Sequence, residues 1–152
     1  MLTSLNNLPK KILFLCTGNY YRSRFAEELF NLKAAKLNIP YVADSAALAL
    51  ERGRENYGPI SWYTIDGLET RGIKLGDDIR HPKAVTPEDL ESAFLIIAMD
   101  KLEHHPIVTE RHPDWIERMT FWDVADIDLV EPPEALAKIE RLVDALVKTL
   151  SR

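Results

Sequence analysis

Unbroken apolar runs and helically spaced apolar residues alternate along this chain, and the alternation predicts strands separated by helices. Ile12 to Cys16 and Phe94 to Met99 are continuous apolar runs, which is typical of parallel strands buried on both faces. Shorter strands are expected at Tyr41 to Ser45 and at Arg118 to Trp122. This order favours a three-layer α/β/α fold, in which helices cover both faces of a central four-stranded parallel sheet.

Two helices are predicted in the first half of the chain. Apolar residues recur at helical spacing from Ser23 to Leu37, as expected of a helix with one buried face. A second helix is expected from Pro59 or Ser61 to Arg71, where Gly72 ends it. Trp62-Tyr63 lies within this second helix, and both aromatic rings are expected to be half-buried.

The second half carries start signals for three more helices. Thr86-Pro87 is typical of an N-cap followed by the first helical residue. Asp100 is expected to cap the helix that follows the second long strand. Pro132-Pro133 opens the last helix, whose apolar face is formed by Leu136, Ile139, Leu142, Val143, Leu146, Val147 and Leu150.

The size and charge of the chain argue against several classes of protein. Its 152 residues suit a single domain, expected over residues 1–152, with a core that needs no disulfide or structural metal. A net charge of −5 argues against nucleic-acid binding. No apolar run approaches membrane-spanning length, and residues 1–11 lack the features of a secretory signal. Because a single cysteine forms no intrachain disulfide, we expect a cytoplasmic protein.

That single cysteine, Cys16, ends the first apolar run and opens the loop Cys-Thr-Gly-Asn-Tyr-Tyr-Arg-Ser, residues 16–23. A loop between a strand and a helix aims backbone N–H groups and the helix N-terminus at one point, which suits an anion. Gly18 and Asn19 tolerate the left-handed backbone geometry that a tightly wrapped loop needs. The sequence therefore predicts a phosphate-binding loop formed by Thr17, Gly18, Asn19, Tyr20, Tyr21, Arg22 and Ser23.

Two side chains at the end of this loop predict chemistry as well as binding. Arg22 offers a fork of donors that matches two phosphate oxygens. The positive potential of the loop favours the thiolate of Cys16, and Ser23 is placed to donate a hydrogen bond to it. The alternative is a buried structural cysteine beside an unrelated surface arginine, which is the common meaning of a bare Cys-x5-Arg spacing.

These residues resemble the signature of the low-molecular-weight protein tyrosine phosphatase family, in which a strand leads into Cys-x-Gly-Asn-x-Cys-Arg-Ser and a helix bearing Ala-Glu. Asp44-Ser45-Ala46 is similar to the family's Ser-Ala-Gly-Thr, which implies that Ser45 supports the loop. Weaker likenesses follow in the family's order at Gly72-Ile73, Thr86 to Leu90 and Ile97 to Asp100. The resemblance implies a phosphomonoester hydrolase that uses a cysteinyl-phosphate intermediate on Cys16, with Arg22 as phosphate ligand.

The reaction also requires an acid, because a leaving oxygen departs more easily when it is protonated. Asp123, Asp126 and Asp128 follow the last predicted strand. The family commonly has Asp-x-x-Asp-Pro in this loop with the acid before proline, which by register implies Asp126, although Ile127 replaces the proline. Asp123 and Asp128 remain alternatives, and at least two of the three carboxylates are expected to lie in a solvated loop.

Several positions depart from the family's pattern. Tyr21 stands where the family usually has a second cysteine, so no disulfide within the chain can protect Cys16 from peroxide. Tyr20 stands where tyrosine phosphatases often have Ile and phosphoarginine enzymes have Thr. Its ring is expected either to stack on a flat leaving group or to pack in the pocket wall. Arg24 replaces a usual proline, and His81 lies near a basic motif of the family.

Two other functions stay open from sequence alone. One is an arsenate reductase coupled to an external thiol, and the other is a phosphate- or phosphoprotein-binding module without catalysis. A metal site at His104, His105 and His112 is disfavoured, because adjacent histidines point to different sides of a helix. The resemblance implies no cofactor and no metal, a phosphorylated protein or small aryl phosphate as substrate, and a monomer or weak dimer. No nucleic-acid or membrane partner is expected.

Overall fold

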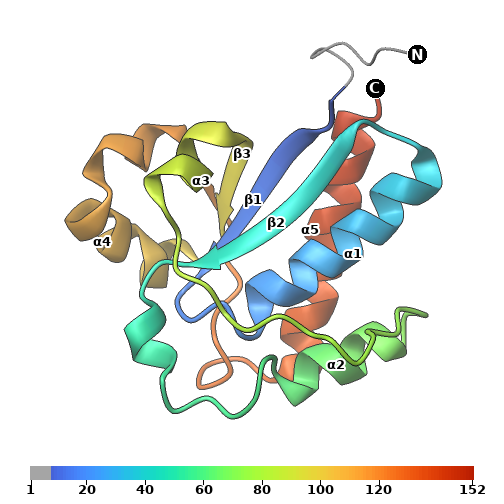
Figure 1. Ribbon diagram of the computed structural model, residues 1–152, viewed down its shortest axis with the longest axis horizontal. Coiled ribbons are helices and arrows are strands. Elements are labelled where there is room, and N and C mark those ends of the chain that lie inside the picture. Colours follow the sequence, from blue (N-terminus) through green and yellow to red (C-terminus); the bar gives the residue numbers. More distant parts are fainter. Residues whose placement is uncertain (1–7) are drawn as a thin grey trace.

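A four-stranded, entirely parallel sheet in the order β2-β1-β3-β4 forms the centre of the molecule (Figure 1). The computed structural model describes residues 8–152. Its strands are β1 (Lys10–Cys16), β2 (Tyr41–Ala47), β3 (Ala93–Ala98) and β4 (Met119–Phe121). This confirms the fold class expected from sequence. Residues 1–7, which belong to the expected single domain and to the stretch expected to hold no signal, lie outside the described residues.

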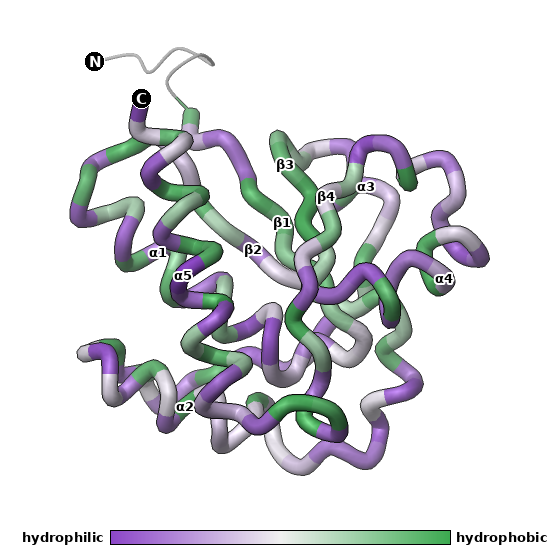
Figure 2. The backbone as a smooth tube through the Cα atoms, turned by 180° about the vertical axis from the view of Figure 1, so that it is seen from behind, coloured by the Kyte–Doolittle hydropathy of each residue, from purple (hydrophilic) through white to green (hydrophobic). Residues whose placement is uncertain are grey.

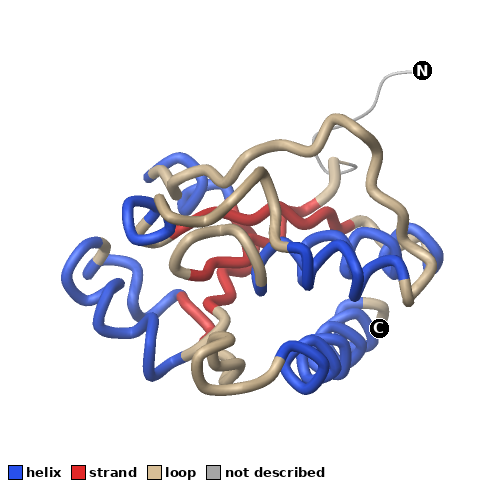
Figure 3. Tube along the Cα trace, turned by 90° about the horizontal axis from the view of Figure 1, so that it is seen from below, coloured by secondary structure: helices blue, strands red, loops and turns tan. Residues whose placement is uncertain are grey.

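Strand β1 is the middle of the core, which explains its continuous apolar sequence. Ile12, Phe14 and Cys16 face one side of the sheet, and Leu13 and Leu15 face the other. Each of these side chains is buried, because helices cover both faces of a parallel sheet. Figure 3 shows the strands in the middle of the molecule with helices on either side.

One face of the sheet is covered by α1 (Arg22–Leu37), α2 (Trp62–Glu69) and α5 (Pro132–Leu150). Along α5, hydrophobic and hydrophilic residues alternate (Figure 2), and the apolar ones pack into the core. All seven predicted residues of this face do so: Leu136, Ile139, Leu142, Val143, Leu146, Val147 and Leu150. The other face is covered by α3 (Pro87–Ser92) and α4 (Lys101–Arg111).

The helices begin where the sequence predicted, but one of the predicted N-caps, Asp100, does not cap its helix. Ser61 caps α2 by accepting the N–H of Tyr63, and Thr86 forms a capping box with Asp89. Asp100 does precede α4, but its carboxylate accepts no N–H of that helix. Its backbone instead forms a bridge with Asp123 and donates its N–H to His104 Nδ1.

The loops that leave the strands are joined to one another at the carboxyl edge of the sheet. Leu48 N–H donates to Cys16 O, and Ala49 N–H donates to Thr17 O, both at 2.9 Å. Val124 N–H donates to the carbonyl of Met99 at 2.8 Å. The sequence did not predict two short 3₁₀ helices: η2 (Leu50–Gly53), which follows β2 at this edge, and η3 (Pro113–Arg118), which joins α4 to the start of β4. The carboxyl edge is where α/β sheets bind ligands.

Candidate active site

The cysteine loop, residues 16–23, joins β1 to α1 at this edge. Asn19 has a φ of 53°, which places it in the left-handed region, where an asparagine is tolerated better than most residues. Gly18 was expected to share this geometry, but its φ is not positive. A Cβ added at Gly18 would make only ordinary van der Waals contacts, 3.5 Å from Asn56 Nδ2 and 3.6 Å from the Gly53 Cα.

The Asn19 amide uses its full hydrogen-bonding capacity to fix the shape of the loop. Its Nδ2 donates to Ser23 Oγ at 2.8 Å and to Ser45 Oγ at 2.9 Å. Its Oδ1 accepts from Arg80 Nη1 at 3.0 Å and from the Lys83 N–H at 3.2 Å. An amide has two donors and two acceptor lone pairs, so Asn19 ties the loop to β2 and to the segment before α3. Ser45, the residue expected to support the loop, is one of these partners.

Ser23 Oγ lies 2.9 Å from Cys16 Sγ, and both side chains are buried. Ser23 Oγ accepts a hydrogen bond from Asn19, and when Cys16 is a thiolate the sulfur has no proton, so the Ser23 hydroxyl is the donor of this contact. A hydroxyl that donates to sulfur stabilises the thiolate rather than the thiol. The structure thus brings Cys16 and Ser23 together as the sequence predicted.

Arg22 is also buried, and the partner that orients it was not predicted from sequence. Glu103 on α4 binds the guanidinium with both oxygens, at 3.0 Å to Nη1 and 2.7 Å to Nη2. Nη1 also donates to the Val124 carbonyl at 2.9 Å. Burial alone would lower the pKa of Arg22, but the hydrogen bond and charge of Glu103 raise it above its ordinary value. None of these contacts involves Nε of Arg22.

The carboxylate of Glu103 is itself held by a small network. Asp100 N–H donates to His104 Nδ1 at 3.0 Å, so the other ring nitrogen carries the proton and donates to Glu103 Oε2 at 3.1 Å. Thr17 Oγ1 donates to the same oxygen. Burial alone would raise the pKa of Glu103, but the hydrogen bonds from His104 and Arg22 hold it well below its ordinary range.

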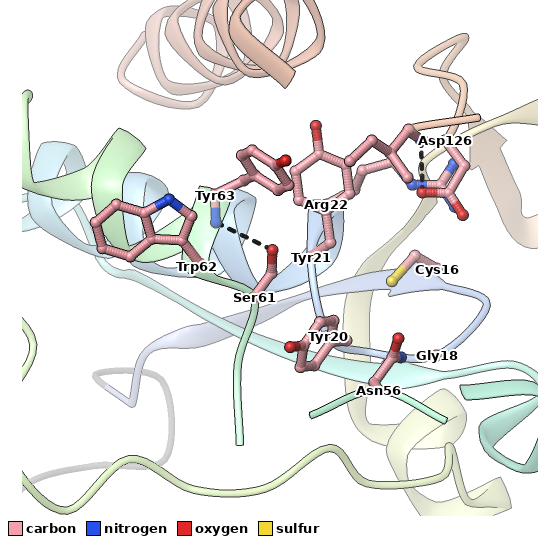
Figure 4. A pocket seen from close by; sticks show the side chains of 11 residues that line it. Cys16, Gly18, Tyr20, Tyr21, Arg22, Asn56, Ser61, Trp62, Tyr63 and Asp126 are labelled. Carbon is pink, nitrogen blue, oxygen red and sulfur yellow. Dashed lines mark hydrogen bonds and ion pairs between the residues drawn. The ribbon is translucent and has the colours of Figure 1, made fainter. Parts of the chain in front are cut away.

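A cavity of about 330 Å³ opens in front of Cys16 (Figure 4). Tyr20, Tyr21, Trp62 and Tyr63 supply aromatic walls, and the remaining lining residues are Gly18, Arg22, Asn56, Ser61, Asp126 and Ile127. Tyr63 is 44% exposed, which agrees with the prediction of a half-buried ring, whereas Trp62 is 64% exposed and is more exposed than expected. They lie in the first turn of α2, which stands beside the cysteine loop and directs them to the rim.

Of the three candidate acids, Asp126 alone lines this cavity. Its Oδ2 lies 3.5 Å from Arg22 Nη2, and its Oδ1 accepts the N–H of Ile127 at 2.8 Å. A proline in place of Ile127 could not make the second contact, because it has no N–H. Asp123 pairs with Lys138 at 2.9 Å on the surface, and Asp128 is exposed.

A second arginine, Arg80, supports the cysteine loop, whereas the sequence pointed to the neighbouring residue, His81. Arg80 reaches Asn19 Oδ1, Ser45 Oγ and Glu27 Oε1, each at 3.0 Å. His81, which was associated with the family's basic motif, is exposed and makes none of these contacts. Arg80 lies in a segment without strand or helix, so no periodic pattern marks it. Only a basic residue near the motif could have suggested it.

Arg24, another departure from the family's pattern, is buried and donates to the carbonyls of Pro59 and Arg80 at 3.0 and 2.7 Å. It therefore joins the loops around the site.

Within residues 8–152, no group of three or more His, Cys, Asp or Glu side chains is arranged to hold a metal ion. No helix in this range is long and apolar enough to span a membrane.

The fold and the site define a class: an α/β protein with a cysteine-containing anion loop at the carboxyl edge of a parallel sheet. The comparison with protein families agrees with this geometry. The model of the low molecular weight phosphotyrosine protein phosphatases matches residues 11–152. The chain belongs to this family, which makes it a phosphatase by family.

Solved structures show the same fold. A low molecular weight protein tyrosine phosphatase from T. tengcongensis is 25% identical, with a TM-score of 0.75 and coverage of 92% of this chain and 99% of that chain. The YwlE arginine phosphatase from Geobacillus stearothermophilus is 24% identical, with a TM-score of 0.72 and 93% of both chains covered. Vibrio vulnificus Wzb, in complex with benzylphosphonate, is 20% identical, with a TM-score of 0.71 and coverage of 93% and 97%. No curated protein sequence matches the chain.

Proposed function

We propose that this protein hydrolyses aryl phosphate monoesters, phosphotyrosine in proteins among them, through a cysteinyl-phosphate intermediate. The observation that carries the proposal is the grouping of Cys16, Arg22 and Asp126 around one cavity, with Ser23 Oγ 2.9 Å from the Cys16 sulfur. A nucleophile, an anion ligand and a carboxyl group are the three parts that the reaction needs.

In the first step the Cys16 thiolate attacks phosphorus. The S–P bond forms as the P–O bond to the leaving group breaks, and Asp126 gives its proton to the leaving oxygen. Arg22 and the N–H groups of the cysteine loop bind the phosphoryl oxygens and stabilise the transition state. In the structure Arg22 Nη2 lies 3.5 Å from the Asp126 carboxylate. A bound phosphoryl group competes with Asp126 for this nitrogen. Substrate binding thereby frees Asp126 to face the leaving oxygen.

In the second step water attacks the cysteinyl phosphate. Asp126 accepts a proton from the water as the new P–O bond forms and the S–P bond breaks. Cys16 leaves as a thiolate, which the hydrogen bond from Ser23 stabilises. Inorganic phosphate departs and the enzyme returns to its starting state. No metal ion takes part in either step.

The preference for an aromatic leaving group rests on the walls of the cavity. Tyr20 is fixed in place by a hydrogen bond from its hydroxyl to the Tyr57 carbonyl. Trp62 and Tyr63 stand exposed at the rim, where flat rings favour stacking on a phenyl group. The neighbouring structures include tyrosine and arginine phosphatases, and these aromatic walls favour the aryl ester.

The test is hydrolysis of phenyl phosphate by the purified protein in EDTA, beside Cys16→Ser and Asp126→Asn. We expect turnover that survives the chelator, disappears in Cys16→Ser and falls by about 100-fold or more in Asp126→Asn. Trapping in acid is expected to recover phosphate bound to sulfur in the parent protein.

The opposite outcomes separate the other functions. Turnover that persists in Cys16→Ser would exclude the cysteine mechanism. Phosphate binding without turnover would favour a binding module. Consumption of an external thiol that depends on arsenate, in the absence of phosphatase activity, would favour an arsenate reductase.

A further inference from the structure

The hydroxyl of Tyr21 is the only buried side-chain nitrogen or oxygen without a hydrogen-bond partner among residues 8–152. Tyr21 is 7% exposed and lies in the wall of the cavity that contains Cys16 and Asp126. Leaving a buried hydroxyl unpaired costs stability, and native proteins rarely do so without a reason. A phenylalanine would fill the same space without this cost.

Both the backbone and the ring of Tyr21 are held in place. Its backbone carbonyl accepts a hydrogen bond from the Thr64 hydroxyl at 2.9 Å. Its ring packs edge to face against that of Tyr63, with centroids 6.5 Å apart. Tyr21 occupies the N-cap position of α1, yet its side chain caps nothing. Its hydroxyl is therefore a donor in a fixed position, aimed at a place where the structure holds no acceptor within hydrogen-bonding distance (Figure 4).

Three titratable groups act on this hydroxyl. Charges of Asp126 and Arg22, and the neighbouring Tyr63, act on it. Arg22 offers donors and no acceptor. The Tyr21 oxygen is itself buried, so its partner is sought among the protein groups around it. Asp126 is the charged acceptor of the set, and its side chain is 42% exposed and held by the Ile127 N–H and by the 3.5 Å ion pair with Arg22.

The hydroxyl is also kept in its donating form. Burial and then the charge of Asp126 raise the pKa of Tyr21 to about 12. In the present structure Asp126 faces Arg22 instead, at 3.5 Å. A phosphoryl group bound to Arg22 removes that attraction and repels the carboxylate.

We infer that Tyr21 is a positioning residue for Asp126, an inference that rests on the proposed role of Asp126 as the acid. When substrate occupies Arg22, one carboxyl oxygen of Asp126 accepts the hydrogen bond from Tyr21 Oη. The other oxygen then carries its proton toward the leaving group. The proton of Tyr21 stays on Tyr21 throughout, so the contact orients the acid and takes no part in the transfer.

The experiment compares Tyr21→Phe with the parent protein on two substrates, phenyl phosphate and 2,4-dinitrophenyl phosphate, in parent and Asp126→Asn backgrounds. The dinitrophenolate leaves without help from an acid, whereas phenolate needs it. We expect kcat/KM of Tyr21→Phe to fall about fivefold to tenfold on phenyl phosphate and less than about twofold on the dinitrophenyl ester. Inhibition by inorganic phosphate is expected to be unchanged, and Asp126→Asn is expected to abolish any further effect of Tyr21→Phe.

A folding measurement completes the design. Because the substitution removes only an unpaired buried hydroxyl, Tyr21→Phe is expected to unfold at the same or a higher temperature than the parent. If Tyr21 had only a structural role, Tyr21→Phe would not be more stable and less active than the parent. Tyr63→Phe, which removes the neighbouring hydroxyl, is expected to show no dependence on the leaving group.

Several results would overturn the inference. One is an equal loss on both substrates, and another is a loss that persists undiminished in the Asp126→Asn background. A selective loss in Tyr63→Phe would identify Tyr63 as the partner of Tyr21. If Asp126→Asn alone shows no leaving-group dependence, the proposed acid is wrong and the inference falls with it. That arm separates a failure of the proposed function from a failure of the role of Tyr21.

Discussion

The carboxylate of Glu103 grips the guanidinium of Arg22 through two parallel hydrogen bonds, 3.0 Å from Oε1 to Nη1 and 2.7 Å from Oε2 to Nη2. This contact joins the first turn of α4 to the first residue of α1, two elements from opposite faces of the sheet. It fixes the plane of the guanidinium of Arg22, which is one of the residues that line the cavity. A bidentate pair provides orientation as well as energy.

Replacing Glu103 by glutamine is the direct test of this orientation. In Glu103→Gln the charge on the acceptor is lost and one of the two parallel bonds becomes a mismatch of donors. We expect kcat/KM on aryl phosphates to fall by about tenfold or more, and the free energy of unfolding to fall by about 1–3 kcal/mol. Steady-state kinetics and urea unfolding measure the two effects.

Glu51 offers a matched control, because it forms a similar two-pronged pair with Arg111 at 2.9 and 3.0 Å on the surface. Surface pairs contribute little to stability, so Glu51→Gln is expected to change neither activity nor unfolding appreciably. Equal effects of the two substitutions would show that Glu103 has no special role.

Glu103 also predicts a dependence of stability on pH. Its pKa is held below the ordinary range in the folded protein, whereas an unfolded chain has a glutamate pKa of about 4.3. The stabilisation is therefore fully present above about pH 5 and is lost as pH falls toward the folded pKa. We expect the difference in unfolding free energy between the parent and Glu103→Gln to shrink below about pH 4. Urea titrations from pH 7 to pH 3 measure it, and a difference constant over that range would contradict the prediction.

Arg80 is expected to matter for activity although it does not line the cavity. It is held between Asn19, Ser45 and Glu27, and so supports the cysteine loop from behind. Arg80→Met removes these bonds while keeping most of the side-chain length, and we expect kcat/KM to fall by about tenfold. His81→Ala serves as the control, since His81 is exposed beside it. A larger loss in His81→Ala than in Arg80→Met would contradict this assignment.

Asn19 combines a left-handed backbone with four side-chain hydrogen bonds, and two substitutions separate the contributions. Asn19→Gly and Asn19→Ala both lose the bonds, but only alanine adds the strain of a φ of 53°. We expect Asn19→Ala to be less stable than Asn19→Gly by about 1 kcal/mol, with both variants far less active than the parent. Chemical denaturation measures the difference. Equal stabilities would mean that the loop relaxes out of the left-handed region.

Much of the framework follows from local patterns in the sequence. The continuous apolar run that became β1 has no polar face to present to solvent, so it is buried between two layers of helices. The seven apolar residues of α5 share one face because they recur at helical spacing. The cysteine loop is a contiguous segment, so its sequence alone predicts that Cys16, Arg22 and Ser23 lie close together at the carboxyl end of β1.

The tertiary structure decided which distant residues complete the site. Glu103 and Arg80 lie 81 and 61 residues from the loop atoms that they bind, and nothing in their local sequence marks them as partners. Asp126 is different, because the resemblance implied it by register while Asp123 and Asp128 stayed open, and of the three it alone borders the cavity. Trp62 and Tyr63 were expected only as half-buried helix residues, and the position of α2 beside the cysteine loop places them at the rim of the cavity. Sequence determines periodicity and contiguous motifs, whereas the meeting of loops from separate strands depends on how the sheet is assembled.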